Sequence, residues 1–286
     1  MSTTTSNKRR LTPADRLNAT VTHVLLIVFV ILAVGPILVV IMNSFKTTAG
    51  IFSGPFLPPT AETFNLQGYE NVFKRGEFFL NYQNSLIVTL ATVVITVVFA
   101  TFAAYALTEY KVRITPLLAG FFILGIMLPI RLGTVPILKT MISWGIIDTL
   151  LALILVYTAM SLPLAVALMM TYFRSVPGEL KEAARMDGAG EFRTLGITIP
   201  LVRPGIAAVA SITMLPVWND LWFPLILAPS HENQTVTLGV QQFVGQFQSD
   251  YPALLAALTL GAVPLIVLFT VFSRQFIQGL SAGYGK

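Results

Sequence analysis

The sequence predicts an all-α membrane protein with six transmembrane helices. Of its 286 residues, 55% are hydrophobic and only 11% are charged, and the mean hydropathy is +0.77, values that are atypical of a soluble globular domain. Six apolar stretches each have the length of roughly 20 residues or more that a helix needs to cross the hydrocarbon core. Lys and Arg gather near the ends of these stretches, as they do in loops beside a membrane.

The first apolar stretch, residues 21–42, is expected to be an uncleaved first span. It follows a polar, basic tail at residues 1–20, but it is too long for a signal peptide and lacks a small-residue cleavage site. Pro36 inside the stretch predicts a kink. Residues 43–83 then form the longest polar connection, an external loop whose many aromatic residues indicate packing on the membrane surface or on a partner.

The other five spans are expected within a membrane core at residues 84–273, before a basic tail at residues 274–286. Their expected ranges are 84–107, 115–138, 150–173, 202–227 and 253–272. A short charged turn, residues 109–113, follows the first of them. That same span holds four threonines suited to hydrogen bonding within the helix or to a neighbouring helix, namely Thr89, Thr92, Thr96 and Thr101.

Two groups of residues in these spans are candidates for the translocation path. Arg131 follows Pro129 in the third span, so it would either touch the transported molecule at a broken helix or lie among the outer headgroups, which we favour. Trp218, Asn219 and Asp220 lie in the fifth span, and we expect the last two to face the bundle interior. An acid inside a span is costly and hence a functional candidate, whereas flanking tryptophans are equally typical of an interfacial belt.

The basic residues predict the orientation of the chain. If the N-terminus is inside, 13 of the 18 Lys and Arg residues lie on that side, in the two tails, the 109–113 turn and the central loop. Both termini and the central loop are therefore expected in the cytoplasm. The net charge of +5 reflects these loops and does not indicate a nucleic-acid partner. Because there is no cysteine, disulfides, thiolate metal sites and cysteine nucleophiles are excluded.

The central loop, residues 177–205, is a polar island between two apolar stretches. It contains four acids and, with Arg174, five bases. We predict a short helix with Pro177 in its first turn and with Gly188 at its end in a positive-φ conformation. One face of this helix is smooth and small with an acid at its end, and consists of Leu180, Ala183, Ala184 and Asp187. Such a helix is shaped to be held by another protein, although an ordinary amphipathic surface helix would also fit.

Within this loop, Glu182-Ala183-Ala184, then Gly188, then Ile197-Thr198-Ile199-Pro200 resemble the EAA motif of ABC importer permeases. In that family the loop forms the coupling helix, which is seated in a cleft of a cytoplasmic ATPase. The resemblance implies the same role here between spans four and five. The implied coupling residues are Glu182, Ala183, Ala184, Asp187 and Gly188. Ile199 stands where the family usually has Leu, which exchanges one apolar side chain for another.

Further motifs resemble the second of the two paired permeases of carbohydrate importers. They are Asn84-Ser85-Leu86, Ala103-Ala104-Tyr105-Ala106-Leu107, Met127-Leu128-Pro129, Trp218-Asn219-Asp220 and Arg274-Gln275-Phe276. Asp220 replaces the usual Glu, and Tyr251-Pro252 replaces a common Trp-Gly pair. The resemblance implies a type I ABC importer permease fold in the cell (inner) membrane. The implied partners are a second permease, two ATPase subunits and an extracytoplasmic sugar-binding protein.

The sequence indicates no catalytic site. It contains no Gly-x-x-x-x-Gly-Lys-Ser/Thr loop, so ATP and Mg²⁺ are expected on separate ATPase subunits, with no cofactor or metal on this chain. His23 and His231 lie far apart in the sequence, which disfavours an intramembrane enzyme. Two alternatives remain open. An importer of another small solute would share the EAA loop, and a secondary transporter would usually show an internal repeat.

Overall fold

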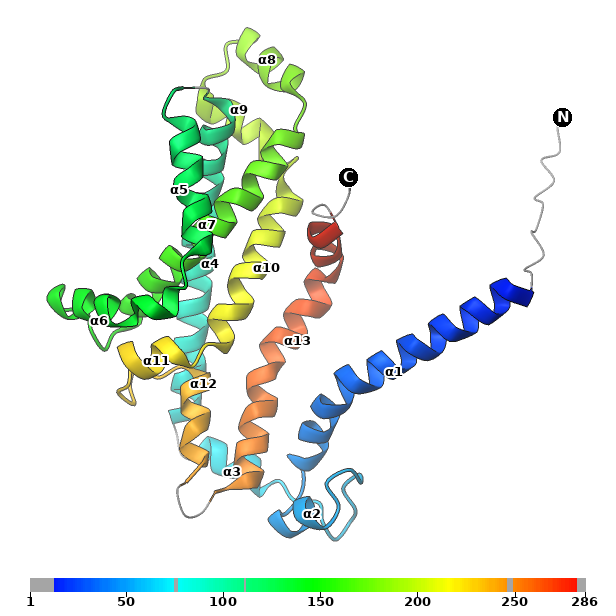
Figure 1. Cartoon of the computed structure of the whole chain (residues 1–286). Helices are drawn as coiled ribbons and strands as arrows, with labels where there is room; N and C mark the ends of the chain where they lie inside the picture. The colour runs from blue at the N-terminus through cyan, green and yellow to red at the C-terminus, as the bar shows by residue number, and fades with distance from the viewer. Residues whose placement is uncertain (1–12, 75–76, 111, 246–248, 282–286) are drawn as a thin grey trace.

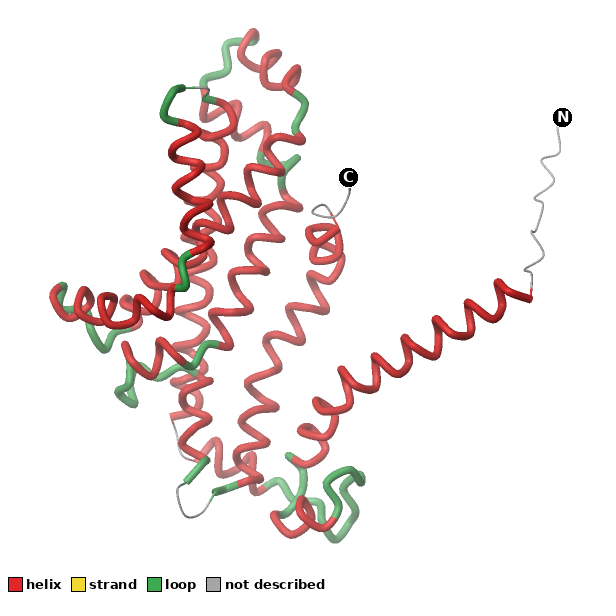
Figure 2. Tube along the Cα trace, in the orientation of Figure 1, coloured by secondary structure: helices red, strands yellow, loops and turns green. Residues whose placement is uncertain are grey.

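The structure is a computed structural model, and it describes residues 13–74, 77–110, 112–245 and 249–281. Within these ranges all regular secondary structure is helical, apart from one isolated bridge between Lys46 and Phe64. Figures 1 and 2 show a bundle of long helices, short helices at both of its ends, and one long helix that leaves it. The predicted all-α fold class is confirmed.

α1 (Pro13–Asn43) stands away from the bundle (Figure 1). Its segment Asn18–Asn43 is the most apolar of the candidate spans, with a mean hydropathy of 3.4 and 0% of its apolar window buried in the chain. Pro36 lies inside this continuous helix. A helix that is apolar and not covered by its own chain belongs in contact with lipid or with another membrane protein.

The connection after α1 is a packed unit with two short helices, α2 (Thr48–Ser53) and α3 (Gln67–Lys74). Lys46 at its start is 1% exposed. The Lys46 ammonium donates to Asn43 Oδ1 at 2.9 Å and to the carbonyl oxygens of Gly54 and Leu57 at 2.9 and 2.6 Å. These three acceptors compensate for the burial of the charge, and they hold the start of the connection together.

α4 (Glu77–Glu109) and α7 (Leu150–Ser175) form the central pair of the bundle. Small buried side chains such as Ala104 and Ala165 let their backbones approach, and larger ones such as Phe173 complete the core. α4 begins at Glu77, earlier than the expected start of this span at residue 84.

Three of the four α4 threonines that we expected to form hydrogen bonds lack them. Thr92, Thr96 and Thr101 are buried, and their hydroxyl oxygens have no hydrogen-bond partner. The hydrogen-bonding role predicted for these three residues is therefore wrong, and they serve as small packing residues between α4 and its neighbours.

The expected third span, residues 115–138, is not one helix. α5 (Thr115–Met127) ends before Pro129, and after the 3-10 turn η1 (Ile130–Gly133) the chain continues into α6 (Thr134–Ser143), with a bend of 87°. Pro129 accounts for the place of the break, because a proline disfavours the helical region for the residue before it. Leu128 accordingly has an extended ψ of 123°. α6 projects sideways from the bundle (Figure 1).

The expected fifth span, residues 202–227, is also divided. Within it, α10 (Arg203–Asn219) ends at Asn219 and α11 (Trp222–Leu227) follows after two residues. Just before it, α9 (Glu191–Thr198) meets α10 at 80°. The remaining short helices are α12 (Val236–Gly239), which contacts α4, and η2 (Val240–Phe243), which contacts α13 (Tyr251–Ser281).

In the described part of the chain, three helices are long and apolar enough to cross a membrane, or five if each bent pair counts as one span. The other expected span corresponds to α13, whose apolar helix Tyr251–Val267 is shorter. α1 and α13 both extend from the end of the molecule that holds α3 toward the end that holds α8 (Gly178–Met186), as Figure 1 shows. The chain is a multi-pass membrane protein.

Candidate functional site

α8 lies at the tip of the bundle, beyond the end of α7 (Figure 1). Glu179 lies in its first turn and Arg185 in its last turn, where each charge interacts favourably with the helix dipole. Pro177 stands at the N-cap, one position before the first turn in which we expected it. The short helix predicted in the polar island is therefore present, with a small shift at its start.

Gly188 ends α8 in the predicted left-handed conformation, with φ +79°. Its amide donates to the carbonyl of Arg185 at 3.0 Å, and the amide of Ala189 donates to the carbonyl of Ala184 at 2.9 Å. This pair of bonds is a Schellman motif. No atom lies within 4 Å of where a Cβ would stand on Gly188, so backbone conformation, and not space, restricts this position.

α8 has an inner and an outer face. Lys181 and Ala184 are each 8% exposed and face the rest of the chain. Glu182, Ala183 and Asp187 are exposed. This corrects part of the expected coupling surface, because the packing of Ala184 inside its own chain leaves it unavailable to a separate protein.

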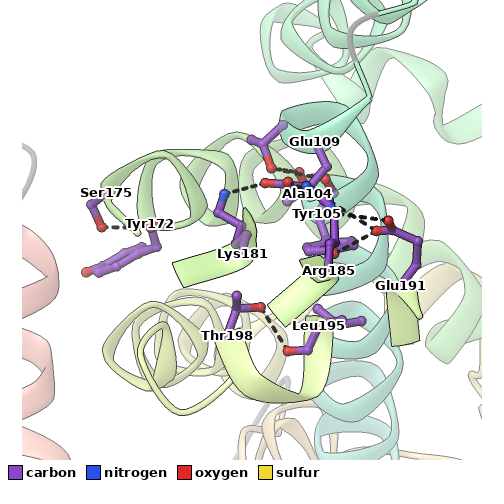
Figure 3. Close-up of polar contacts among 11 residues, drawn as sticks. Ala104, Tyr105, Glu109, Tyr172, Ser175, Lys181, Arg185, Glu191, Leu195 and Thr198 are labelled. Carbon is purple, nitrogen blue, oxygen red and sulfur yellow. Dashed lines mark hydrogen bonds and ion pairs between the residues drawn. The ribbon is translucent and has the colours of Figure 1, made fainter. Parts of the chain in front are cut away.

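A charged network fastens the inner face of α8 to α4 (Figure 3). Glu109, the last residue of α4, pairs with Lys181 through one carboxylate oxygen and with Arg185 through the other, at 3.0 Å. Arg185 also pairs with Glu191, the first residue of α9, at 3.2 Å. The hydroxyl of Tyr105 donates to Glu191 at 2.9 Å. The network thus joins α4, α8 and α9.

Glu109 and Lys181 are the members of the network least exposed to solvent. The side chains of Glu109 and Lys181 are 8% and 10% exposed, whereas those of Arg185 and Glu191 are 38% and 41% exposed. Hydrogen bonds from Arg185 and then from Tyr105 hold the pKa of Glu191 below its ordinary value. Hydrogen bonds to Glu191 and to Glu109 raise the pKa of Arg185. Both shifts favour the charged forms that the network needs.

From the sequence, Glu109 belongs only to a short charged turn, and its pairing with α8 is missed. One signal was available. A carboxylate at the C-terminal end of a helix lies at the negative end of the helix dipole, so it is unfavourable there unless cations neutralise it.

Two large apolar side chains are exposed near this tip. Met186 in α8 and Phe192 in α9 are 88% and 83% exposed. Both lie beside the accessible charged groups of α8 and α9.

The candidate path residues in the fifth span have separate surroundings. Trp218 is 2% exposed and donates from its indole N–H to the carbonyl of Gly261 at 3.0 Å, so it anchors α10 to α13 and is not available to a path. Asn219 is exposed and donates to the carbonyl of Leu215 in its own helix. The expectations that Trp218 lines a path and that Asn219 faces the bundle interior are therefore wrong.

Asp220 joins three helices at the corner after α10. Its carboxylate accepts a hydrogen bond from the hydroxyl of Tyr157 in α7 at 2.9 Å and another from the amide of Phe223 at 3.0 Å. The second bond caps the start of α11. Asp220 thus points toward α7, where its contacts are those of a structural residue.

Arg131 is exposed in η1, and its guanidinium lies 5.8 Å from the ring centre of Trp222 in α11. The Trp222 indole donates to the hydroxyl of Thr134 at 3.0 Å. This stacked group therefore ties η1 and α6 to α11 on the side of the bundle.

Comparison with known proteins identifies the family of this chain. Residues 96–281 match the family model described as a binding-protein-dependent transport system inner membrane component. The chain belongs to this family. The resemblance inferred from the EAA loop and the later motifs is confirmed at the level of the family, and the chain is a permease component of a transport system.

Two characterised relatives match nearly the whole chain. The diacetylchitobiose uptake system permease protein NgcG of Streptomyces coelicolor is 31% identical over 278 residues, which cover 96% of this chain and 91% of the relative. The trehalose transport system permease protein SugB of Mycobacterium tuberculosis is 31% identical, and the match covers 88% of this chain and 92% of the relative.

The fold is shared with a solved importer. The crystal structure of a bacterial ABC transporter involved in the import of the acidic polysaccharide alginate contains a chain that is similar with a TM-score of 0.81. The identity is 23%, and the match covers 93% of this chain and 98% of the other. The predicted importer permease fold is confirmed.

Proposed function

We propose that the chain is the permease subunit of an ATP-driven, binding-protein-dependent importer of small saccharides, and that α8 is the contact through which a cytoplasmic ATPase drives it. The observation that carries the proposal is the position of α8, a short polar helix at the tip of a membrane bundle with its outer face open. A second permease completes the path, two ATPase subunits bind and hydrolyse ATP, and an external binding protein delivers the sugar.

The outer face of α8 suits a cleft that is both basic and apolar. The carboxylates of Glu182 and Asp187 offer charge-assisted hydrogen bonds, each worth roughly 1.5–3 kcal/mol when partnered. Ala183 between them is small enough for close approach of another backbone. Met186 adds an exposed apolar side chain next to these groups.

The orientation of the chain supports a cytoplasmic partner. Of the 18 Lys and Arg residues, 13 fall on the side that holds the central loop. The start of α1 and the end of α13 are the ends of these helices that lie farther from α3 (Figure 1), as a chain with both termini on the α8 side requires. We therefore assign the α8 end to the cytoplasm.

The saccharide class is supported by what the relatives transport. Permeases for diacetylchitobiose, trehalose and, in Halalkalibacterium halodurans, arabinooligosaccharides are 29–31% identical to this chain over most of its length. We propose that Asn219, which is exposed, contributes to the path, and that Arg131 lies among the outer headgroups.

The coupling role is tested with Glu182→Lys in the complex formed with the partner permease, the ATPase subunits and the binding protein. A lysine on the outer face of α8 should repel a basic cleft, so the chain should remain in the membrane while co-purification of the ATPase and sugar uptake are lost. Glu62→Lys, on the exposed connection after α1, is the matched control and should leave both unchanged. Normal uptake in Glu182→Lys would show that α8 is only a linker.

The substrate class is tested separately. The binding protein that supports uptake is purified from cells with its natural ligand, and the ligand is identified by mass spectrometry. A saccharide is expected. A peptide or another solute would contradict the substrate class and leave the permease assignment intact.

A further inference from the structure

α4 is a long helix without the residues at which helices usually kink. Among the described helices with more than 15 residues, it alone contains neither Pro nor Gly. The others contain Pro36 in α1, Pro163 in α7, Pro216 in α10 and Pro264 in α13. Sharp kinks in long helices occur mostly at such residues. The 33 residues of α4 therefore form an uninterrupted rod about 50 Å long at 1.5 Å per residue.

One end of this rod holds α8. The carboxylate of Glu109 is buried and lies at the negative end of the α4 dipole, and both conditions make an unpaired charge costly. Lys181 and Arg185 of α8 neutralise it from both carboxylate oxygens (Figure 3). Through Arg185 and Tyr105, Glu191 links α9 to the same network. α8 is therefore attached to α4 by side-chain ion pairs as well as by the connecting backbone.

The other end of the rod holds the polar segment between α11 and α12. The side-chain amide of Asn84 donates to the carbonyl oxygens of Glu232 and Gln234 at 2.8 and 3.0 Å. The hydroxyl of Ser85 accepts from the amide of Val236 at 2.8 Å. Asn84 and Ser85 are 4% and 2% exposed, so these bonds are shielded from water. A displacement of this segment would therefore act on α4 directly.

From these observations we propose that Glu109 is a positioning residue that locks α8 to α4, so that α8 and the segment at residues 232–236 move together through one rigid helix. The proposal rests on the function proposed above, since only a chain driven through α8 needs such a link. ATP-driven movement of α8 reaches the far end of the bundle through α4. Docking of the loaded binding protein at the far end reaches the ATPase by the same route.

The test measures the ATPase activity of the complete complex in proteoliposomes, with and without the sugar-loaded binding protein. Glu109→Gln keeps the side-chain shape and removes the charge. We expect the complex to assemble and to keep its basal ATPase activity. Its stimulation by the loaded binding protein and its sugar uptake should each fall about tenfold, within the usual range of coupling between sites. Glu70→Gln, which removes an exposed pair with Lys74, is the matched control and should change neither.

A charge exchange separates coupling from simple loss of a side chain. Glu109→Lys or Lys181→Glu alone places like charges together and should abolish the stimulation. The double variant restores the opposite-charge pair between positions 109 and 181. Arg185 keeps Glu191 but loses its partner at position 109, so a large part of the stimulation, and not all of it, should return. A double variant that assembles but stays as defective as either single one would contradict the ionic lock.

If the single variants fail to assemble, a cross-link between positions 109 and 181 tests whether α8 must be attached to α4. Because the chain has no cysteine, Glu109→Cys with Lys181→Cys can be joined in membranes by a short bifunctional maleimide. The cross-linked complex should keep its stimulation by the binding protein. An assembled, cross-linked complex without stimulation, or wild-type stimulation in Glu109→Gln, would overturn the proposal. A wild-type chain that binds no ATPase subunit would instead contradict the proposed function.

Discussion

At the residue scale, Gly188 is the position in α8 where a single side chain should have the largest effect through the backbone alone. Its φ of +79° costs an L-residue about 1–2 kcal/mol, and more for a β-branched one. We expect Gly188→Val to turn the chain away from its present course after α8 and to abolish sugar uptake, with the protein still in the membrane.

The control for this prediction lies two residues further on. Gly190 has an extended backbone, with φ −69° and ψ 168°, and no atom lies within 4 Å of the place that a Cβ would take on it. Gly190→Val should therefore retain uptake. Sugar uptake is measured for both variants, and their membrane levels are compared by immunoblot. An equal loss of uptake in both variants would show that backbone conformation at Gly188 does not cause the loss.

At the scale of elements, the corner between α10 and α11 depends on Asp220. Asp220→Leu would leave the hydroxyl of Tyr157 and the amide of Phe223 without their acceptor, and an unsatisfied buried group costs about 1–3 kcal/mol. Asp220→Asn keeps a carbonyl oxygen at this place. We expect a clear drop in thermal stability in detergent for the Leu variant and a smaller one for the Asn variant. Equal stability of Asp220→Leu and the wild type would mean that the corner is held by other contacts.

The same elements show what the sequence could predict and what it could not. The short helix in the polar island follows from local signals, namely its charges and Gly188. The break after Met127 does not, because a proline in an apolar stretch permits both a continuous and a broken helix. Pro36 and Pro163 lie inside continuous helices, whereas Pro129 stands at a break. The difference depends on packing that a single sequence does not contain.

The candidate site was predictable to the same extent. The exposed residues of α8 follow from the motif, but the burial of Ala184 and Lys181 follows from contact with the rest of the chain. Lys181 and Glu109 are 72 positions apart, and nothing local to either residue indicates the other. Asp220 shows the same limit, because its partner Tyr157 is 63 positions away. Long-range pairs of this kind decide which side of a short helix remains open.

At the scale of the whole molecule, one orientation in the bilayer must account for both the exposed apolar surface and the distribution of charge. α1 is uncovered by its own chain, and α5 contains no buried residue, so lipid or another membrane protein must cover both. The polar ends of the bundle then lie on opposite sides of the membrane, one with α2, α3 and residues 228–235, the other with α8 and α9 (Figure 1). The excess of Lys and Arg is the reason for our proposal that the α8 end lies in the cytoplasm.

This orientation predicts the outcome of thiol labelling on intact cells, where the absence of native cysteine removes any background from this chain. Ser53→Cys and Glu232→Cys place exposed thiols at the α3 end, and Gly190→Cys places one at the α8 end. An impermeant maleimide should label the first two and leave the third unlabelled until the membrane is permeabilised. Labelling of Gly190→Cys on intact cells would reverse the orientation and remove α8 from the reach of a cytoplasmic ATPase.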